Sequence, residues 1–315
     1  MTAVPDAVQP VAGPAYDAPA PPVGTAPRRR RGTAQAPPST VLTVAVLATV
    51  AYFLLPLVWI VVASTKSNAD LFSSFGLWFA DDFNLLQNLR DVFTFQDGIF
   101  LSWARNTVVY AVVSAVGAAA LATAAGYAFA KLRFPGSNGL FAIILGAIMI
   151  PLTALAIPTY LLFSRFGLTD TPWAVILPSL VSPFGVYLMR VYAAGAIPDS
   201  LIEAARVDGA SELRIFLSVV LRLLAPGFVT VLLFALVATW NNYFLPLIML
   251  NSSELYPLTV GLAQWQATSQ AGSGSQALFS MVITGSMVSI IPLIVVFLFL
   301  QRYWQSGLAT GGVKQ

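Results

Sequence analysis

The chain contains no cysteine and no histidine, and charged residues make up only 9% of its 315 residues. Without cysteine there is no disulfide and no thiol nucleophile, and without histidine there is no imidazole for a zinc site, a haem or a catalytic triad. These absences exclude most of the chemistry of soluble enzymes. We therefore predict no catalytic, cofactor-binding or metal-binding residue in this chain.

Lysine is scarce, and none of the three lysines lies in a phosphate-binding motif. Lys66, Lys131 and Lys314 follow threonine, alanine and valine, whereas the Gly-x-x-x-x-Gly-Lys-Ser/Thr loop requires a preceding glycine. The chain is not expected to bind ATP by that route. The net charge is only +3, and the basic residues do not form a stripe. Nucleic-acid binding is therefore not expected either.

Apolar residues are abundant, at 57% of the chain with a mean hydropathy of +0.79. A helix needs roughly 20 apolar residues to cross about 30 Å of hydrocarbon. Six stretches of that kind lie near 41–63, 104–130, 139–164, 173–193, 227–250 and 278–300. The sequence predicts an all-α, polytopic protein of the bacterial cytoplasmic membrane with six transmembrane helices in contact with lipid.

The distribution of lysine and arginine predicts the orientation. With the N-terminus inside, twelve of the basic residues lie on the inner side and four on the outer side. Both termini are thus expected in the cytoplasm. Residues 1–40 are rich in proline and alanine and are predicted to be a disordered cytoplasmic tail. Residues 41–315 form the predicted transmembrane domain, with an outer loop at 64–103.

The predicted spans contain no ionisable residue away from their ends. Carriers driven by protons or sodium usually place such residues inside the membrane, and they usually show internal repeats. An ion-coupled secondary carrier for small polar solutes is the alternative function. It would not co-purify with an ATPase, whereas a transporter driven by ATP would.

One polar segment, residues 198–226, interrupts the apolar pattern on the predicted inner side. Asp199 or Ser200 is suited to cap a short helix, and Gly209 permits the positive φ that ends it. A second helix start follows at Ser211, and apolar residues then recur at helical spacing as far as Pro226. This pattern predicts two helices at an angle, lying at the membrane surface.

The first of these helices has two interpretations. It is either an ordinary surface helix between spans or a site that a soluble protein grips from inside the cell. In the second interpretation small alanines permit close approach and the charged residues make charge-assisted contacts. The candidate coupling residues are Glu203, Ala204, Ala205, Arg206, Asp208 and Gly209.

These residues resemble the EAA loop of permease subunits of bacterial ABC importers. The matching pattern is Glu203-Ala204-Ala205, then Gly209, then Val219 and Leu221. The flanking motifs are similar to those of the carbohydrate branch and its smaller maltose-type permease: Gly126 to Gly136, Met149-Ile150-Pro151, Trp240 to Phe244, Tyr256 to Leu262 and Gly307 to Lys314. One departure is Arg222, where the family pattern has proline, so the second helix is expected to continue to Pro226.

The resemblance implies a sugar importer with divided labour. This chain would pair with a second, similar permease as a heterodimer. A dimer of cytoplasmic ATPases would carry ATP and Mg²⁺ and hold the loop around Glu203, while an extracytoplasmic solute-binding protein would deliver the sugar. The chain itself would not be an enzyme. The sequence does not identify the sugar.

Polar and aromatic residues in the predicted third and fifth spans are candidates for the translocation pathway. Asn241 and Asn242 lie near the middle of the predicted fifth span beside Tyr243, and amides with aromatic faces suit a sugar. The alternative is hydrogen bonding between helices. Thr153 and Tyr160 lie where Pro151 frees backbone carbonyls, so they either line a cavity or flank a simple kink.

Overall fold

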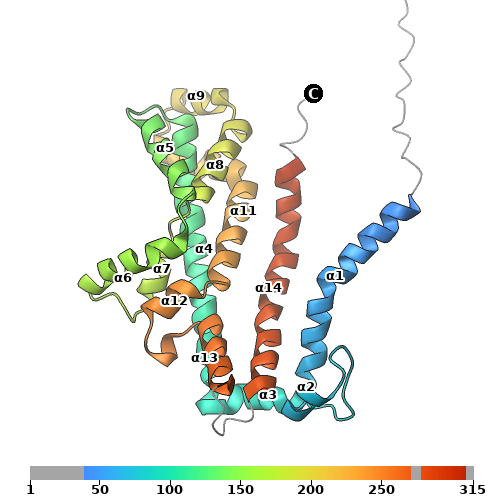
Figure 1. Cartoon of the computed structure of the whole chain (residues 1–315). Helices are drawn as coiled ribbons and strands as arrows, with labels where there is room; N and C mark the ends of the chain where they lie inside the picture. Colours follow the sequence, from blue (N-terminus) through green and yellow to red (C-terminus); the bar gives the residue numbers. More distant parts are fainter. Residues whose placement is uncertain (1–38, 271–277, 310–315) are drawn as a thin grey trace, which may run out of the picture. The chain divides into compact units, whose positions relative to one another are not determined.

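The computed structural model describes residues 39–270 and 278–309, with side chains as far as residue 301. The predicted disordered tail, 1–40, therefore falls almost wholly outside the described residues. Helix α1, Thr40–Ser64, crosses the boundary at residues 51 and 52 between two compact units. All later elements belong to the second unit, and Figure 1 labels most of its helices.

Every regular element among the described residues is helical, as the sequence predicts. The elements of the second unit are α2 (Asn68–Ser73), α3 (Leu85–Thr94), η1 (Phe95–Gly98), α4 (Ile99–Lys131), α5 (Ser137–Ile148), η2 (Leu152–Leu155), α6 (Ala156–Arg165), α7 (Trp173–Ser179), α8 (Pro183–Ala196), α9 (Asp199–Val207), α10 (Glu212–Ile215), the π-helix η3 (Phe216–Val220), α11 (Leu221–Trp240), α12 (Phe244–Met249), η4 (Ser253–Leu255), α13 (Leu258–Gln270) and α14 (Leu278–Ala309).

Within residues 39–270 and 278–309, five helical segments are long and apolar enough to cross a membrane, and a bent pair brings the number to six. The bent pair is the predicted third span: α5 and α6 meet at 100° on either side of Pro151. Proline has no amide hydrogen and fixes its own φ, so the helix cannot continue straight through this position. The predicted six spans are thus confirmed if the bent pair counts as one.

Helix α4 forms the centre of the second unit and packs against both α8 and α11. Between Ala111 and Gly126 its buried face consists of small residues, among them Ala115, Ala119 and Ala122, which let neighbouring helices approach closely. At Gly126 an added Cβ would lie 2.5 Å from Cβ of Met189 on α8. The close fit makes α4 and α8 one packed body.

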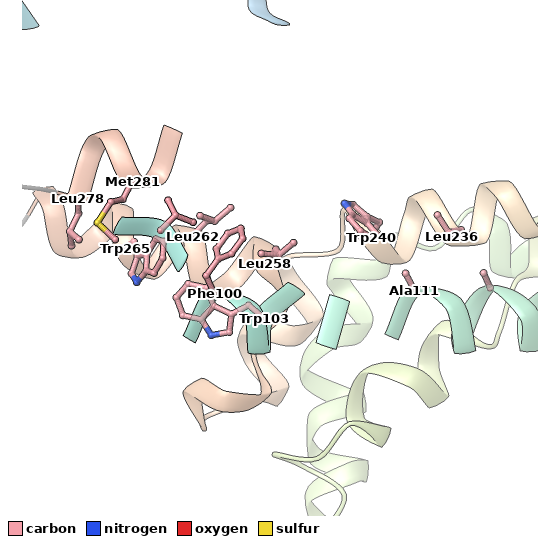
Figure 2. Packing of buried hydrophobic residues seen from close by; sticks show 12 residues of the cluster. Phe100, Trp103, Ala111, Leu236, Trp240, Leu258, Leu262, Trp265, Leu278 and Met281 are labelled. Carbon is pink, nitrogen blue, oxygen red and sulfur yellow. The ribbon is translucent and has the colours of Figure 1, made fainter. Parts of the chain in front are cut away.

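An aromatic cluster lies near the start of α4 (Figure 2). Phe100 and Trp103 of α4 pack against Trp265 of α13, with the Trp103 and Trp265 ring centroids 4.9 Å apart. Leu278 and Met281 of α14 complete it. Burial of large aromatic surfaces fixes α13 and α14 against the first turns of α4.

The segment between α1 and α4, within the predicted outer loop, contains the helices α2 and α3 and the short 3-10 helix η1. The side chain of Asn88 on α3 donates hydrogen bonds to the carbonyls of Ser64 and Lys66, at 2.8 and 2.9 Å. Lys66 is buried and donates to the hydroxyl of Ser74 and the carbonyl of Phe75. These bonds hold α3 against the end of α1.

Candidate functional site

The helix that carries the candidate coupling residues is α9. It begins after Pro198, which occupies the N-cap position and makes no side-chain cap. The predicted capping by Asp199 or Ser200 is therefore wrong. The Asp199 carboxylate instead accepts a hydrogen bond from the side chain of Lys131 at the end of α4.

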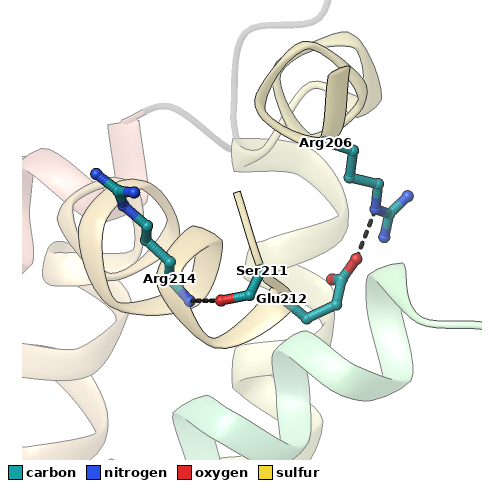
Figure 3. Close-up of polar contacts among 4 residues, drawn as sticks. All are labelled: Arg206, Ser211, Glu212 and Arg214. Carbon is teal, nitrogen blue, oxygen red and sulfur yellow. Dashed lines mark hydrogen bonds and ion pairs between the residues drawn. The ribbon is translucent and has the colours of Figure 1, made fainter. Parts of the chain in front are cut away.

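Gly209 ends this region as predicted, with a φ of +78°. Residues with a Cβ rarely adopt this left-handed conformation, and glycine adopts it at no steric cost. The chain then turns into the next helix, where the hydroxyl of Ser211 accepts a hydrogen bond from the amide of Arg214 (Figure 3). The predicted second helix start is therefore confirmed.

Almost all of α9 is exposed. Glu203, Ala204 and Arg206 face solvent, and Val207 is 87% exposed although it is apolar. Ile202 is the one buried residue of the helix, in a cluster with Ile197 and Ile215. The helix thus offers a charged and small-residue surface while one apolar side chain anchors it.

An ion pair lies at each end of α9. Nζ of Lys131 lies 2.6 Å from Oδ1 of Asp199, and Nε of Arg206 lies 2.6 Å from Oε1 of Glu212 (Figure 3). The Lys131 ammonium holds the pKa of the Asp199 carboxyl below its ordinary value, and the Glu212 carboxylate raises the pKa of the Arg206 guanidinium. Both ends of α9 remain charged around neutral pH.

A pocket of about 780 Å³ separates α9 from the end of α4. Its lining includes Lys131 and Arg133 on one side and Asp199, Glu203 and Arg206 on the other. The helix therefore does not pack flush against α4 along its length. Asp199 was predicted only as a helix cap, and its pairing with Lys131 was not predicted, although a lysine directly after an apolar span was a visible signal.

The predicted end of the second helix at Pro226 is wrong. Residues from Glu212 onward form one continuous helical segment of 29 residues to Trp240, and Pro226 lies inside it. A proline bends a helix without ending it when apolar packing continues on both sides, and here Leu224 and Val231 are both buried. The π-helix η3 precedes the proline and changes the local hydrogen-bond register.

The two candidate asparagines do not lie within a span, so their predicted position is wrong. Helix α11 ends at Trp240, and Asn241 donates a hydrogen bond from Nδ2 to the carbonyl of Val237. The Oδ1 of Asn242 accepts from the amide of Leu245. Asparagine competes for backbone hydrogen bonds and therefore favours helix ends, which is why an apolar stretch of this length contains a break.

The other pathway candidates lie on neighbouring elements. Tyr243 is exposed just before α12, and Thr153 is exposed in η2 at the bend. Tyr160 lies on α6 and packs with the apolar residues around Met249 of α12. The structure thus brings Tyr160 near the helix that follows Tyr243. Their role in a pathway stays a prediction.

The loop from Met249 to Tyr256, here called the clamped loop, is held at the opposite end of α4 from α9. Trp103 Nε1 donates to the carbonyl of Ser253 at 2.8 Å, and Asn106 Nδ2 donates to that of Glu254 at 2.6 Å. Asn106 also donates to the carbonyl of Tyr256, and Tyr110 donates from its hydroxyl to that of Leu255.

Asp170 holds the start of the clamped loop. Its carboxylate accepts hydrogen bonds from the amides of Asn251 and Ser252 and from the Ser252 hydroxyl, at 2.6 to 2.9 Å. These bonds, with the hydroxyl of Ser252 the largest contributor, lower the pKa of Asp170. The sequence analysis missed this role. Asn106, a polar side chain near the start of the second predicted span, was a visible signal for the hydrogen bonds between α4 and this loop.

Comparison with known proteins agrees with this geometry. Residues 119–309 match the family described as "Binding-protein-dependent transport system inner membrane component". The permease protein of an arabinooligosaccharide transport system in Halalkalibacterium halodurans is 34% identical over 271 residues, which cover 86% of this chain and 94% of that protein. Its counterpart in Bacillus subtilis is 34% identical over 263 residues, covering 83% and 91%.

A solved structure is also similar. The crystal structure of a bacterial ABC transporter involved in the import of the acidic polysaccharide alginate matches with a TM-score of 0.72 and 26% sequence identity. The match covers 84% of this chain and 95% of that chain.

The fold and the comparisons define a multi-pass protein of the cytoplasmic membrane. The chain belongs to the family of inner membrane components of binding-protein-dependent transport systems. It is a permease subunit, and the family resemblance inferred from its sequence motifs is confirmed.

Proposed function

We propose that this chain is one of two permease subunits of an ATP-driven ABC importer that carries a di- or oligosaccharide into the cell. The similar arabinooligosaccharide permeases and the similar alginate transporter support a sugar as the substrate class. In this proposal α9 and both termini face the cytoplasm. A second permease completes the pathway, and a solute-binding protein delivers the sugar on the other side.

The observation that carries the proposal is the exposure of α9. Its outer surface combines Glu203 and Arg206 with the small residue Ala204, and within the described residues only Ile202 and the half-buried Ala205 of this helix pack into the apolar cluster beneath it. Charged side chains of this kind make charge-assisted hydrogen bonds, and small residues permit close approach. A cytoplasmic ATPase dimer that binds ATP and Mg²⁺ is the partner that fits.

The transport cycle follows from this contact. When the ATPases close on ATP, they move α9, and the motion reaches the packed helices α4, α8 and α11. ATP hydrolysis and release then return α9 and these packed helices to their starting positions. This chain performs no covalent step, because its contribution is binding, orientation and movement.

Charge reversal on the exposed surface of α9 tests the proposal. In Glu203→Lys and Gly209→Asp variants we expect uptake of a labelled oligosaccharide panel to be abolished and the ATPase to be lost from the purified complex. The protein should still insert, because Glu203 is exposed and an added Cβ at Gly209 meets no atom within 4 Å, so the strain of a side chain at this positive φ is confined to the turn after α9. Membrane fractionation verifies insertion.

Asp81→Lys provides the matched control. This exposed charge reversal lies between α2 and α3, far along the chain from α9, and it should leave both ATPase retention and uptake unchanged. Normal uptake and a retained ATPase in both α9 variants would contradict the proposed coupling role.

A further inference from the structure

The two ion pairs found among residues 39–270 and 278–301 both attach α9 to another helix. Lys131 is the last residue of α4, and Asp199 is the first residue of α9. Arg206 lies in the last turn of α9, and Glu212 begins α10, which continues into α11. One short helix is thus connected at its two ends to two different spans.

Each of the four charges also suits the end of its own helix. Carboxylates stabilise the positive N-terminal end of a helix dipole, and cations stabilise the negative C-terminal end. Asp199 and Glu212 lie in first turns, whereas Lys131 and Arg206 lie in last turns. The helices therefore favour each charge before the pairs form, and the pairing then fixes the direction of α9.

Stability alone does not account for these pairs. Exposed ion pairs contribute little to stability because water screens them, and the side chain of Asp199 is 76% exposed. The side chain of Lys131, by contrast, is only 9% exposed. The mostly buried side chain of Lys131 reaches the solvent-exposed carboxylate of Asp199 beside the open pocket. This arrangement sets the position of α9 relative to the end of α4.

Little else connects α9 to α4. Apart from the ion pair, Ile202 and the half-buried Ala205 pack into the apolar cluster that includes Tyr127 of α4, and the 780 Å³ pocket lies between the exposed side of α9 and the last residues of α4. Helix α4 itself packs closely on α8 and α11. A displacement of α9 along its axis therefore reaches α4 through Lys131 and reaches α11 through Glu212.

We propose that the Lys131–Asp199 and Arg206–Glu212 pairs are mechanical tethers through which α9 moves α4 and α11 together. Lys131, Asp199 and Glu212 are then positioning residues that act through α9 without touching the ATPase. This inference rests on the proposed function of α9. With one tether removed, the ATPase still binds α9, but α9 turns about Ile202 and α4 no longer follows.

The test uses the assembled transporter with both permeases, the ATPase and the binding protein in proteoliposomes. Variants Lys131→Asp, Asp199→Lys and the double exchange are compared, since Arg206 belongs to the proposed ATPase surface and would confuse the two roles. Three quantities are measured: ATPase retained in the purified complex, ATP hydrolysis rate, and uptake of a labelled oligosaccharide identified with the panel above.

Each single reversal should keep the ATPase in the complex and its hydrolysis rate while lowering uptake about tenfold, the size of a typical coupling between sites. The double exchange should recover uptake to within about threefold of the original chain, and not fully, because the exchanged charges oppose their helix dipoles. Lys131→Gln should resemble the single reversals with a smaller loss.

Three results would overturn the inference: unchanged uptake in the single reversals, a double exchange no better than either single, or loss of the ATPase from the single variants. The last result would assign the pair to ATPase binding instead of movement. An original chain that retains no ATPase would refute the proposed function itself, so the two failures are distinguishable.

Discussion

The two ends of α4 are built from different kinds of contact. Near its last residue, Lys131, helix α9 is exposed and is held by two ion pairs and one apolar side chain. Near its start, Trp103, Asn106 and Tyr110 donate hydrogen bonds to successive backbone carbonyls of the clamped loop. Asp170 accepts hydrogen bonds from its amides.

The difference indicates which end moves. Ion pairs with an exposed partner contribute little to stability, so the pairs set the position of α9 while most of its surface stays free of contacts within the described chain. Breaking a bond to a buried or half-buried carbonyl leaves a polar group without a partner and costs about 1–3 kcal/mol. The α9 end is thus suited to movement, whereas the clamped loop is suited to hold its shape.

Disrupting the packing of α4 against α8 should have the largest effect on stability and uptake, because these packed helices join the α9 end of α4 to its clamped-loop end. In Gly126→Leu the new Cβ would lie 2.5 Å from Cβ of Met189 and 2.8 Å from the backbone nitrogen of Arg190. Overpacking costs roughly 1–3 kcal/mol, and more where backbone must shift. We expect a lower Tm in detergent and loss of uptake. Gly146→Leu is the matched control, since no atom lies within 4 Å of its Cβ position.

A Gly126→Leu protein with unchanged Tm and uptake would contradict the view that the two ends communicate through one packed body.

Removal of the Asn106 amide should loosen the clamped loop alone. Asn106→Ala leaves the carbonyls of Glu254 and Tyr256 without this donor, at a cost of about 1–3 kcal/mol. Hydrogen exchange at residues 253–258 should accelerate, while ATPase retention stays unchanged. Asn241→Ala, which removes only a local bond to Val237, should not accelerate that exchange. Equal acceleration at α9 would mean that the two ends are not distinct.

The smallest effect should be that of mild acid on the clamped loop. The hydroxyl of Ser252 and two backbone amides hold the pKa of Asp170 below its ordinary value, which is about 3.9 for an aspartate. A lowered folded pKa contributes stability that is complete above the ordinary pKa and is lost as pH falls through the folded value. Protection of the amides of Asn251 and Ser252, corrected for intrinsic exchange rates, should therefore be equal at pH 7 and pH 5. Loss of protection by pH 5 would contradict it.

The sequence predicted the features that depend on local chemistry. Apolar length identified the spans, the positive φ of Gly209 followed from glycine, and the cap at Ser211 followed from its hydroxyl. The family resemblance was predicted from motifs that this chain has at the spacing typical of the family. Pro151 was recognised as a break, although the 100° bend at this break was not predicted.

The errors concern choices that only packing decides. Pro226 does not end a helix because Leu224 and Val231 bury their side chains on both sides of it. Asn241 ends α11 instead of lying inside it, because its side-chain amide donates a hydrogen bond to the backbone carbonyl of Val237. Asp199 pairs with a lysine 68 residues away, so local capping rules could not identify its partner.

The central claim is that α9 binds the ATPase while the clamped loop does not respond to it. Hydrogen exchange in the reconstituted transporter, with and without the ATPase, measures both regions in one experiment. The account predicts that the ATPase slows exchange at residues 199–209 and leaves residues 251–256 unchanged. Unchanged exchange at 199–209 in a complex that retains the ATPase would contradict it.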